Sequence, residues 1–144
     1  MADLERTLLL VKPDGVARGH VGEVLRRVEA KGYRLAALDL RVPDAGTLAE
    51  HYADHVHRSW YPELEAFMTS GPVVAAVVEG VRVVEGLMTL AGPTDPTLAP
   101  PGTIRGDLGC DVGHGKTENV VHRSDCAEAA EREIKIWFGD ALAR

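Results

Sequence analysis

TLLLV, residues 7–11, is a short, unbroken apolar run that stops at the sequence KPDG at 12–15. An apolar run of this length, bounded by a turn signal, predicts a buried central strand, and it places Lys12 at the strand's end. VVAAVVEG at 73–80 predicts a second buried strand on the same grounds. We therefore expect the fold to be organised around apolar strands.

The rest of the chain alternates helical and extended patterns. Apolar residues recur at helical spacing over 20–31, and Gly32 follows as a stop signal. Asp125, with Glu128 three residues on, resembles a helix cap. The predicted elements are strands at 7–11, 33–42, 73–80 and 119–121, helices at 20–31, 82–91 and 125–138, and a helical segment at 44–70. This β-α-β-β-α-β order, with extra helices between the second and third strands, predicts an α+β fold, in which helices pack on a ferredoxin-like antiparallel sheet.

Composition narrows the class of protein. With 144 residues and 45% hydrophobic content, we expect one globular domain spanning 1–144. The net charge of -6 argues against nucleic acid as a partner, and the apolar stretches are too short to span a membrane. Cys110 and Cys126 lack metal-site spacing and the N-terminus lacks a signal-peptide core, which favours free thiols in a reducing cytoplasm.

Two features between 112 and 125 could handle phosphate. One is the glycine-rich GHGKT at 113–117. A nucleotide-binding loop of the G-x-x-x-x-G-K-S/T type would need a glycine where Cys110 stands, and no strand pattern precedes it, so we expect a solvated loop instead. It belongs to the Pro- and Gly-rich stretch 92–119, whose length is typical of functional, partner-bound or disordered loops. The other feature is His122.

His122 precedes the last predicted helix. The positive end of a helix disfavours protonation of a nearby imidazole, and the neutral imidazole is the form that attacks phosphorus. A lone histidine is more often structural or merely exposed, however. Downstream, Glu133 could orient the ring; alternatively, Ser124 caps the helix and Glu133 is solvated.

The motifs taken together resemble the nucleoside diphosphate kinase family. The matching stretches are ERTLLLVKPDGVARGHVGEVLRRVEAKGYRL near the start, EHYADH at 50–55, SGPVVA at 70–75, PGTIRGD, and NVVHRSD at 119–125 with AEREIKIWF after it. They cover nearly the whole chain. The resemblance implies a ping-pong reaction, in which a nucleoside triphosphate such as ATP phosphorylates a histidine and a nucleoside diphosphate then takes the phosphoryl group. It also implies Mg²⁺ on the phosphates and a homo-oligomer, either a hexamer or a tetramer.

The resemblance also implies residue roles. His122 would be the phosphorylated nucleophile, supported by Glu133 and Ser124, and Tyr52 would hydrogen-bond near the transferred group. The nucleotide contacts would be Lys12 and Arg105 on the transferring phosphates, Thr94 and His55 on other phosphate oxygens, Asn119 with Lys12 on the ribose, and Trp60 and Val112 on the two faces of the base. No protein residue is implied as a metal ligand. Ordinary packing is the alternative for Trp60 and Tyr52.

Three departures from the family pattern bear on activity. Met88 stands where the family has an arginine, Arg123 replaces a glycine, and four extra residues fall between Gly113 and Asn119. Our hypothesis is that Arg123 or Lys116 partly compensates for Met88. A phosphotransferase with an altered acceptor and a weakly active nucleotide-binding regulator remain the alternatives to a nucleoside diphosphate kinase.

Overall fold

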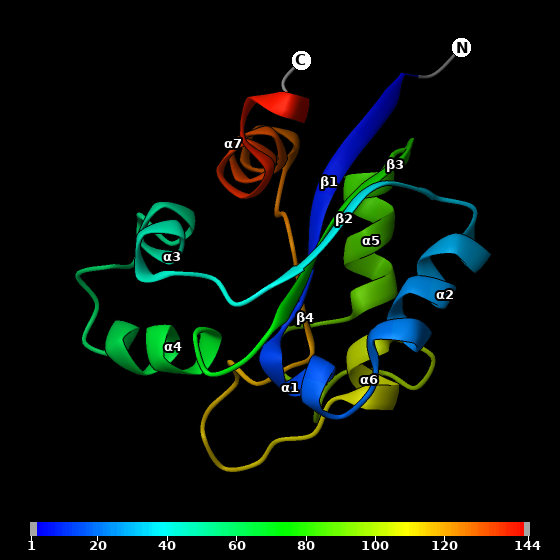
Figure 1. Cartoon of the computed structure of the whole chain (residues 1–144). Helices are drawn as coiled ribbons and strands as arrows, with labels where there is room; N and C mark the ends of the chain where they lie inside the picture. The colour runs from blue at the N-terminus through cyan, green and yellow to red at the C-terminus, as the bar shows by residue number, and fades with distance from the viewer. Residues whose placement is uncertain (1–2, 143–144) are drawn as a thin grey trace.

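A four-stranded antiparallel sheet forms the centre of the molecule, with strand order β2-β3-β1-β4 (Figure 1). The computed structural model describes residues 3–142. The strands are β1 (Leu4–Val11), β2 (Arg34–Arg41), β3 (Val73–Val81) and β4 (Val121–Arg123). Since β1 and β3 lie at the centre and β2 and β4 at the edges, the predicted ferredoxin-like arrangement is confirmed.

Helices cover both faces of this sheet. They are α1 (Pro13–Ala17), α2 (Val21–Lys31), α3 (Ala45–His51), α4 (Tyr61–Met68), α5 (Val83–Ala91), α6 (Ile104–Leu108) and α7 (Ala127–Phe138), followed by a 3₁₀ turn, η1 (Gly139–Leu142). In Figure 1, α2 and α5 lie on one side of the strands, and α3 and α7 on the other. None of the helices within 3–142 is both long and apolar enough to cross a membrane.

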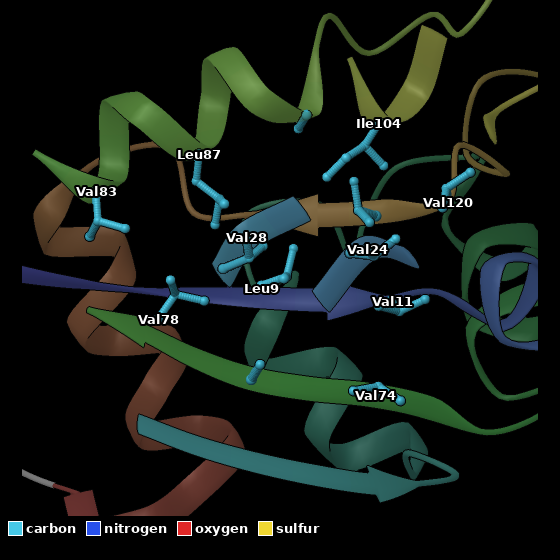
Figure 2. Close-up of a cluster of buried hydrophobic side chains, with 13 residues drawn as sticks. Leu9, Val11, Val24, Val28, Val74, Val78, Val83, Leu87, Ile104 and Val120 are labelled. Atoms are coloured by element: carbon cyan, nitrogen blue, oxygen red, sulfur yellow. The ribbon is translucent and has the colours of Figure 1, made fainter. Parts of the chain in front are cut away.

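The apolar run of β1 serves both layers because neighbouring side chains on a strand point to opposite faces. Leu9 and Val11 pack with α2 and α5 in the cluster of Figure 2. Leu8 and Leu10 pack with α3, α4 and α7. All four side chains are fully buried, and each such burial stabilises the fold by about 1.5–3 kcal/mol.

Three predicted segments differ in detail. The helical segment 44–70 divides into α3 and α4, because nine residues between them form turns and bends. KPDG is not only a turn: α1 begins there, with Pro13 at its first position, where a missing N–H costs nothing. The loop 92–119 contains α6, which Thr103 caps by accepting a hydrogen bond from the Gly106 N–H.

The end of the chain holds a more consequential correction. His122 lies within β4, and α7 begins only at Ala127. The predicted Asp125 cap is wrong: Cys126 is the N-cap residue, and its Sγ accepts a hydrogen bond from Ala129 N–H at 3.4 Å. Asp125 instead pairs with Arg123 at 2.6 Å. The predicted domain, 1–144, includes four residues outside the described range.

Candidate active site

A cavity of about 470 Å³ opens where β1 ends and β4 begins, beside α3 and α7, and it collects most of the predicted site residues. The predicted residues that line it are Lys12, Tyr52, His55, Trp60, Thr94, Arg105, Asn119, His122 and Glu133. Ser124 is fully buried, in contact with Glu133. Val112 is 52% exposed and is not among the lining residues. The structure thus brings together ten of the eleven.

The backbone around β4 is held by the segment KPDG. Val120, just before β4, has a φ of 75°, a left-handed conformation that is strained for a β-branched residue. Its N–H donates to Asp14 Oδ2 at 3.0 Å, and its carbonyl accepts from Lys12 N–H at 2.8 Å. A side chain on Gly15 would lie only 2.8 Å from Val11 Cγ1 and 3.1 Å from the Val120 carbonyl oxygen. Glycine at this position therefore permits the close approach that positions β4.

A hydrogen-bonded chain orients the His122 ring. His122 Nε2 lies 2.8 Å from Glu133 Oε1, and Ser124 Oγ donates to the same carboxylate oxygen at 2.9 Å. Glu133 is buried, so the alternative in which it is solvated is wrong. Ser124 does not cap α7, so its alternative role as a capping residue is wrong as well. A carboxylate accepts hydrogen bonds only, so Nε2 carries the proton in the neutral ring and Nδ1 keeps its lone pair.

The His122 ring is neutral over the physiological range. Burial lowers the pKa of His122 to about 3, and the positive charge of Lys12 adds to the effect. The predicted neutral imidazole is confirmed, although burial rather than the helix end is the leading cause. The ring still has access to the cavity, since the side chain is 19% exposed.

His51 is a site residue that sequence reasoning missed. Its ring packs edge-on against His122, with centroids 4.6 Å apart, and its Nδ1 accepts a hydrogen bond from Trp137 Nε1 at 3.0 Å. Burial lowers the pKa of His51 to about 3. His51 lies in the matching stretch EHYADH, where the resemblance implies roles only for Tyr52 and His55.

His51, His122 and Glu133 also form a group that could hold a metal ion, with one ligand atom of each within 4.8 Å of the others. All three residues already have hydrogen-bond partners, however. The Nδ1 lone pair of His51 takes the Trp137 N–H, and Nε2 of His122 faces Glu133. A metal ion could bind the free Nδ1 of His122, but ligation by His51 would disrupt its hydrogen bond from Trp137, because Nδ1 is the only nitrogen of that neutral ring with a lone pair.

Buried cations lie beside His122. Lys12 Nζ donates to Asn119 Oδ1 at 2.9 Å and to the Thr117 carbonyl at 3.0 Å, and Asn119 Nδ2 donates to the Thr94 carbonyl at 2.9 Å. Burial, aided by the charge of Arg105, lowers the pKa of Lys12 to about 7. Burying a charged amine costs free energy because the charge loses its hydration, and a bound anion would offset that loss. The buried lysine and arginine therefore favour a phosphate as ligand.

Arg105, on α6, is buried and bonded to the backbone. Its three guanidinium nitrogens donate to the carbonyls of Asn119, Gly92 and Val121, at 3.3, 2.9 and 2.7 Å. Burial, with the charge of Arg123 second, lowers the pKa of Arg105 to about 10, so it remains cationic at neutral pH. Arg105 thus ties the loop 92–119 to the strand that carries His122.

The other end of the cavity is open. Trp60 is 44% exposed and contacts His55 with ring centroids 5.3 Å apart. A second hollow of about 870 Å³ adjoins it between α4 and residues 113–118, and Trp60 and Lys116 line both hollows. The wall opposite α4 is therefore the loop 113–118 rather than the predicted Val112. No helix follows GHGKT, so the loop interpretation of that sequence is confirmed.

The structure also locates the departures from the family pattern. Met88, on α5, is 38% exposed and is not among the residues that line the 470 Å³ cavity, whereas Arg123 and Lys116 are. Arg123 is an ordinary strand residue, and positive φ occurs at Arg82 and Val120 but not there. The backbone therefore tolerates this side chain without the strain that a replaced glycine could have caused.

Phosphoryl transfer requires a positioned nucleophile and charges that neutralise the phosphate oxygens. A neutral imidazole in the same cavity as a buried lysine and a buried arginine meets both requirements, and with this α+β topology it defines a phosphotransferase.

Comparison with known proteins narrows the class. A family model described as nucleoside diphosphate kinase matches residues 5–142. A nucleoside diphosphate kinase of Corynebacterium glutamicum (strain R) is 56% identical over 135 residues, covering 93% of this chain and 96% of the relative, and one of Thermobifida fusca is 52% identical over 137 residues, covering 95% and 98%. The chain belongs to the nucleoside diphosphate kinase family.

Solved structures agree. A nucleoside diphosphate kinase from Encephalitozoon cuniculi aligns with a TM-score of 0.90 at 38% identity, covering 97% of this chain and 92% of that one. A halophilic one from Halobacterium salinarum, in complex with CDP, aligns with a TM-score of 0.88 at 43% identity, covering 96% and 90%. The chain is thus a phosphotransferase of a nucleotide-binding family.

Proposed function

We propose that this protein moves the γ-phosphate of a nucleoside triphosphate to a nucleoside diphosphate through a phosphohistidine at His122. The observation that carries the proposal is the Nε2 contact with Glu133 at 2.8 Å. It leaves Nδ1 of a neutral ring as the nucleophilic atom.

The reaction takes place in two half-steps. His122 Nδ1 attacks the γ-phosphorus, the bond from phosphorus to the β-bridging oxygen breaks, and a nucleoside diphosphate leaves. The phosphorylated ring keeps its Nε2 proton and becomes cationic, so the carboxylate of Glu133 stabilises it. A terminal oxygen of a second nucleoside diphosphate then attacks the same phosphorus, the N–P bond breaks, and the neutral ring returns.

Lys12 and Arg105 are the proposed contacts of the phosphates, and Lys12 also reaches the ribose. Lys12 lies at the end of β1 with its Nζ on Asn119, so one amine serves both the transferring phosphate and the ribose end. Arg105 has donors left over after its three backbone hydrogen bonds, since a guanidinium carries five N–H groups. Thr94 and His55 line the same wall and complete the set of proposed phosphate contacts, and Tyr52 lies beside His51.

Magnesium fits the oxygen donors of the cavity. Mg²⁺ prefers phosphate and carboxylate oxygens and retains several waters. Among the lining carboxylates, Glu133 bonds to His122 and Asp125 to Arg123, whereas Asp54 is exposed. Asp54 and the nucleotide's phosphates would therefore hold the ion, which when bound neutralises charge on the β- and γ-oxygens. The proposed phosphate donor is ATP with Mg²⁺.

Two further properties belong to the proposal. The edge strand β2 exposes Leu38 and Leu40, at 56% and 63%, which supports assembly into a homo-oligomer through this edge, as a hexamer or a tetramer. Cys110 and Cys126 are both free and exposed, which supports a reducing, cytoplasmic setting.

Phosphoenzyme formation tests the function. Wild type incubated with ATP labelled at the γ position should acquire acid-labile, alkali-stable label, and unlabelled GDP should then remove it as labelled GTP. His122→Asn, which keeps a polar side chain of similar reach, should acquire none. Unlabelled wild type would overturn the proposal and favour a nucleotide-binding regulator. Label that passes only to a non-nucleotide acceptor would favour the specialised phosphotransferase.

A further inference from the structure

Arg123 follows the nucleophile on β4 and faces the same cavity. In the register of β4 with β1, His122 lies opposite Leu10 and Arg123 opposite Leu9. Their side chains therefore leave the strand on opposite faces. Because β4 is an edge strand, the long side chain of Arg123 can reach around that edge, and it lines the 470 Å³ cavity. That side chain is only 15% exposed.

The guanidinium of Arg123 has unused hydrogen-bonding capacity. Its Nη1 donates to Asp125 Oδ1 at 2.6 Å, while its Nε is buried and has no hydrogen-bond partner among the described residues. Protein atoms enclose that Nε, so a ligand oxygen in the cavity would be bound by the Nη groups, which have donors beyond the one given to Asp125. Arg105 differs, because Nε, Nη1 and Nη2 all donate to backbone carbonyls.

Among the residues that line the cavity, the basic side chains of Lys12, Arg105, Lys116, Arg123 and Arg132 outnumber the carboxylates of Asp54, Asp125 and Glu133. Arg123 contributes to the lowered pKa of Arg105, and Lys12, Arg123 and Arg105 all contribute to that of His122, so the three cations share one region. The carboxylate paired with Arg123 is Asp125, which is 83% exposed and therefore screened by water. A phosphate would relieve the repulsion among the cations more effectively than Asp125 does.

Lys116 is the other cation that the sequence analysis considered. Its side chain is 63% exposed, and its amine lies 3.9 Å from Asp95, at the limit of an ion pair. A solvated lysine on a loop offers one flexible point charge, whereas an arginine held by packing offers a planar fork that matches phosphate. The geometry therefore favours Arg123.

We propose that Arg123 binds a phosphate oxygen of the nucleotide, and that Asp125 holds the guanidinium when no nucleotide is bound. The inference rests on the proposed function, because that function supplies the nucleoside diphosphate as ligand. Asp125 then acts as a competitor that the phosphate displaces.

A double-mutant cycle tests the proposal by calorimetric titration with ADP and, separately, adenosine. Arg123→Met should weaken ADP binding by about tenfold or more and leave adenosine binding unchanged. Asp125→Asn should strengthen ADP binding severalfold, but only while Arg123 is present, so the gain should disappear in the double variant. Arg26→Met is the matched control, because Arg26 also pairs with a carboxylate, Glu23, outside this cavity.

Several outcomes would overturn the inference. They are unchanged ADP affinity in Arg123→Met, an equal loss for adenosine, or an Asp125→Asn gain that persists without Arg123. If Arg123→Met does not fold, Arg123→Lys and Asp125→Asn carry the test, and unchanged affinity in both overturns it. These titrations need no turnover, so the absence of a phosphoenzyme would defeat the proposed function without deciding this test.

Discussion

The two ends of the cavity are built differently. At the end around His122, the side chains of Lys12, Asn119 and Glu133 are nearly fully buried and hydrogen-bonded: Lys12 bonds to Asn119, 107 positions away, and Glu133 to His122. At the end around Trp60, the walls are an exposed ring and the loop 113–118, whose ion pairs are exposed or long. The first end is fixed by the core, and the second is largely independent of it.

We expect the buried end to control the rate of the reaction and the open end to control how tightly the base is bound. A nucleophile must be aimed within fractions of an ångström, which requires a packed and hydrogen-bonded surround. Stacking on an aromatic face is tolerant of the base, so the open end can accept insertions at little cost to the reaction. Substitutions at the buried end should therefore change rates, and those at the open end should change affinities modestly.

The largest effect is expected at Glu133. In the proposed mechanism, Glu133→Gln removes the charge that would stabilise a phosphorylated ring, and its amide can hold the ring in the wrong tautomer. The rate of His122 phosphorylation in a single turnover should fall on the order of 100-fold or more. Ser124→Ala removes one hydrogen bond to the same carboxylate and should cost only about fivefold. A Glu133→Gln rate within threefold of wild type would contradict the expectation that the buried end controls the rate. ADP affinity and thermal unfolding are measured on the same variants to exclude loss of binding or of folding.

The second prediction concerns acid stability and uses His51. Its pKa is about 3 in the folded state and 6.5 in the reference state, so between those pH values the unfolded chain binds the extra proton. Stability therefore falls as pH is lowered from 6.5 to 3. His51→Asn should reduce the slope of the free energy of unfolding against pH by up to about 1.4 kcal/mol per pH unit. Urea titrations between pH 4 and 6.5 measure it, and an unchanged slope would show that His51 is not buried as a neutral ring.

The smallest effects are expected at the open end. Trp60→Ala should raise KM for nucleotides by about tenfold through lost stacking, with little change in kcat, and Trp60→Phe should restore most of the loss. Lys116→Ala should change either constant by less than about threefold, because an exposed ion pair contributes little. A large loss of kcat in Lys116→Ala would mean that the loop belongs to the chemical end.

Much of the site could be predicted from sequence because motif and position coincide there. Lys12 ends an apolar strand, and His122 precedes a helix-forming stretch; both lie in the cavity as expected. His51 was missed because its partners, Trp137 and His122, lie 86 and 71 positions away, and no local pattern marks such contacts. Val112 lines neither hollow, because residues 113–118 form the wall facing Trp60.

By itself, the sequence determined the strands, the main helices and the types of side chain available for phosphate chemistry, since periodicity and turn residues act over a few neighbours. Only the tertiary structure decided which nitrogen of His122 is free, why the ring is neutral, and that Arg123 is mostly buried at the cavity whereas Lys116 is exposed. Those properties depend on burial and on hydrogen bonds between residues such as Lys12 and Asn119, 107 positions apart, which exist only once the sheet has formed.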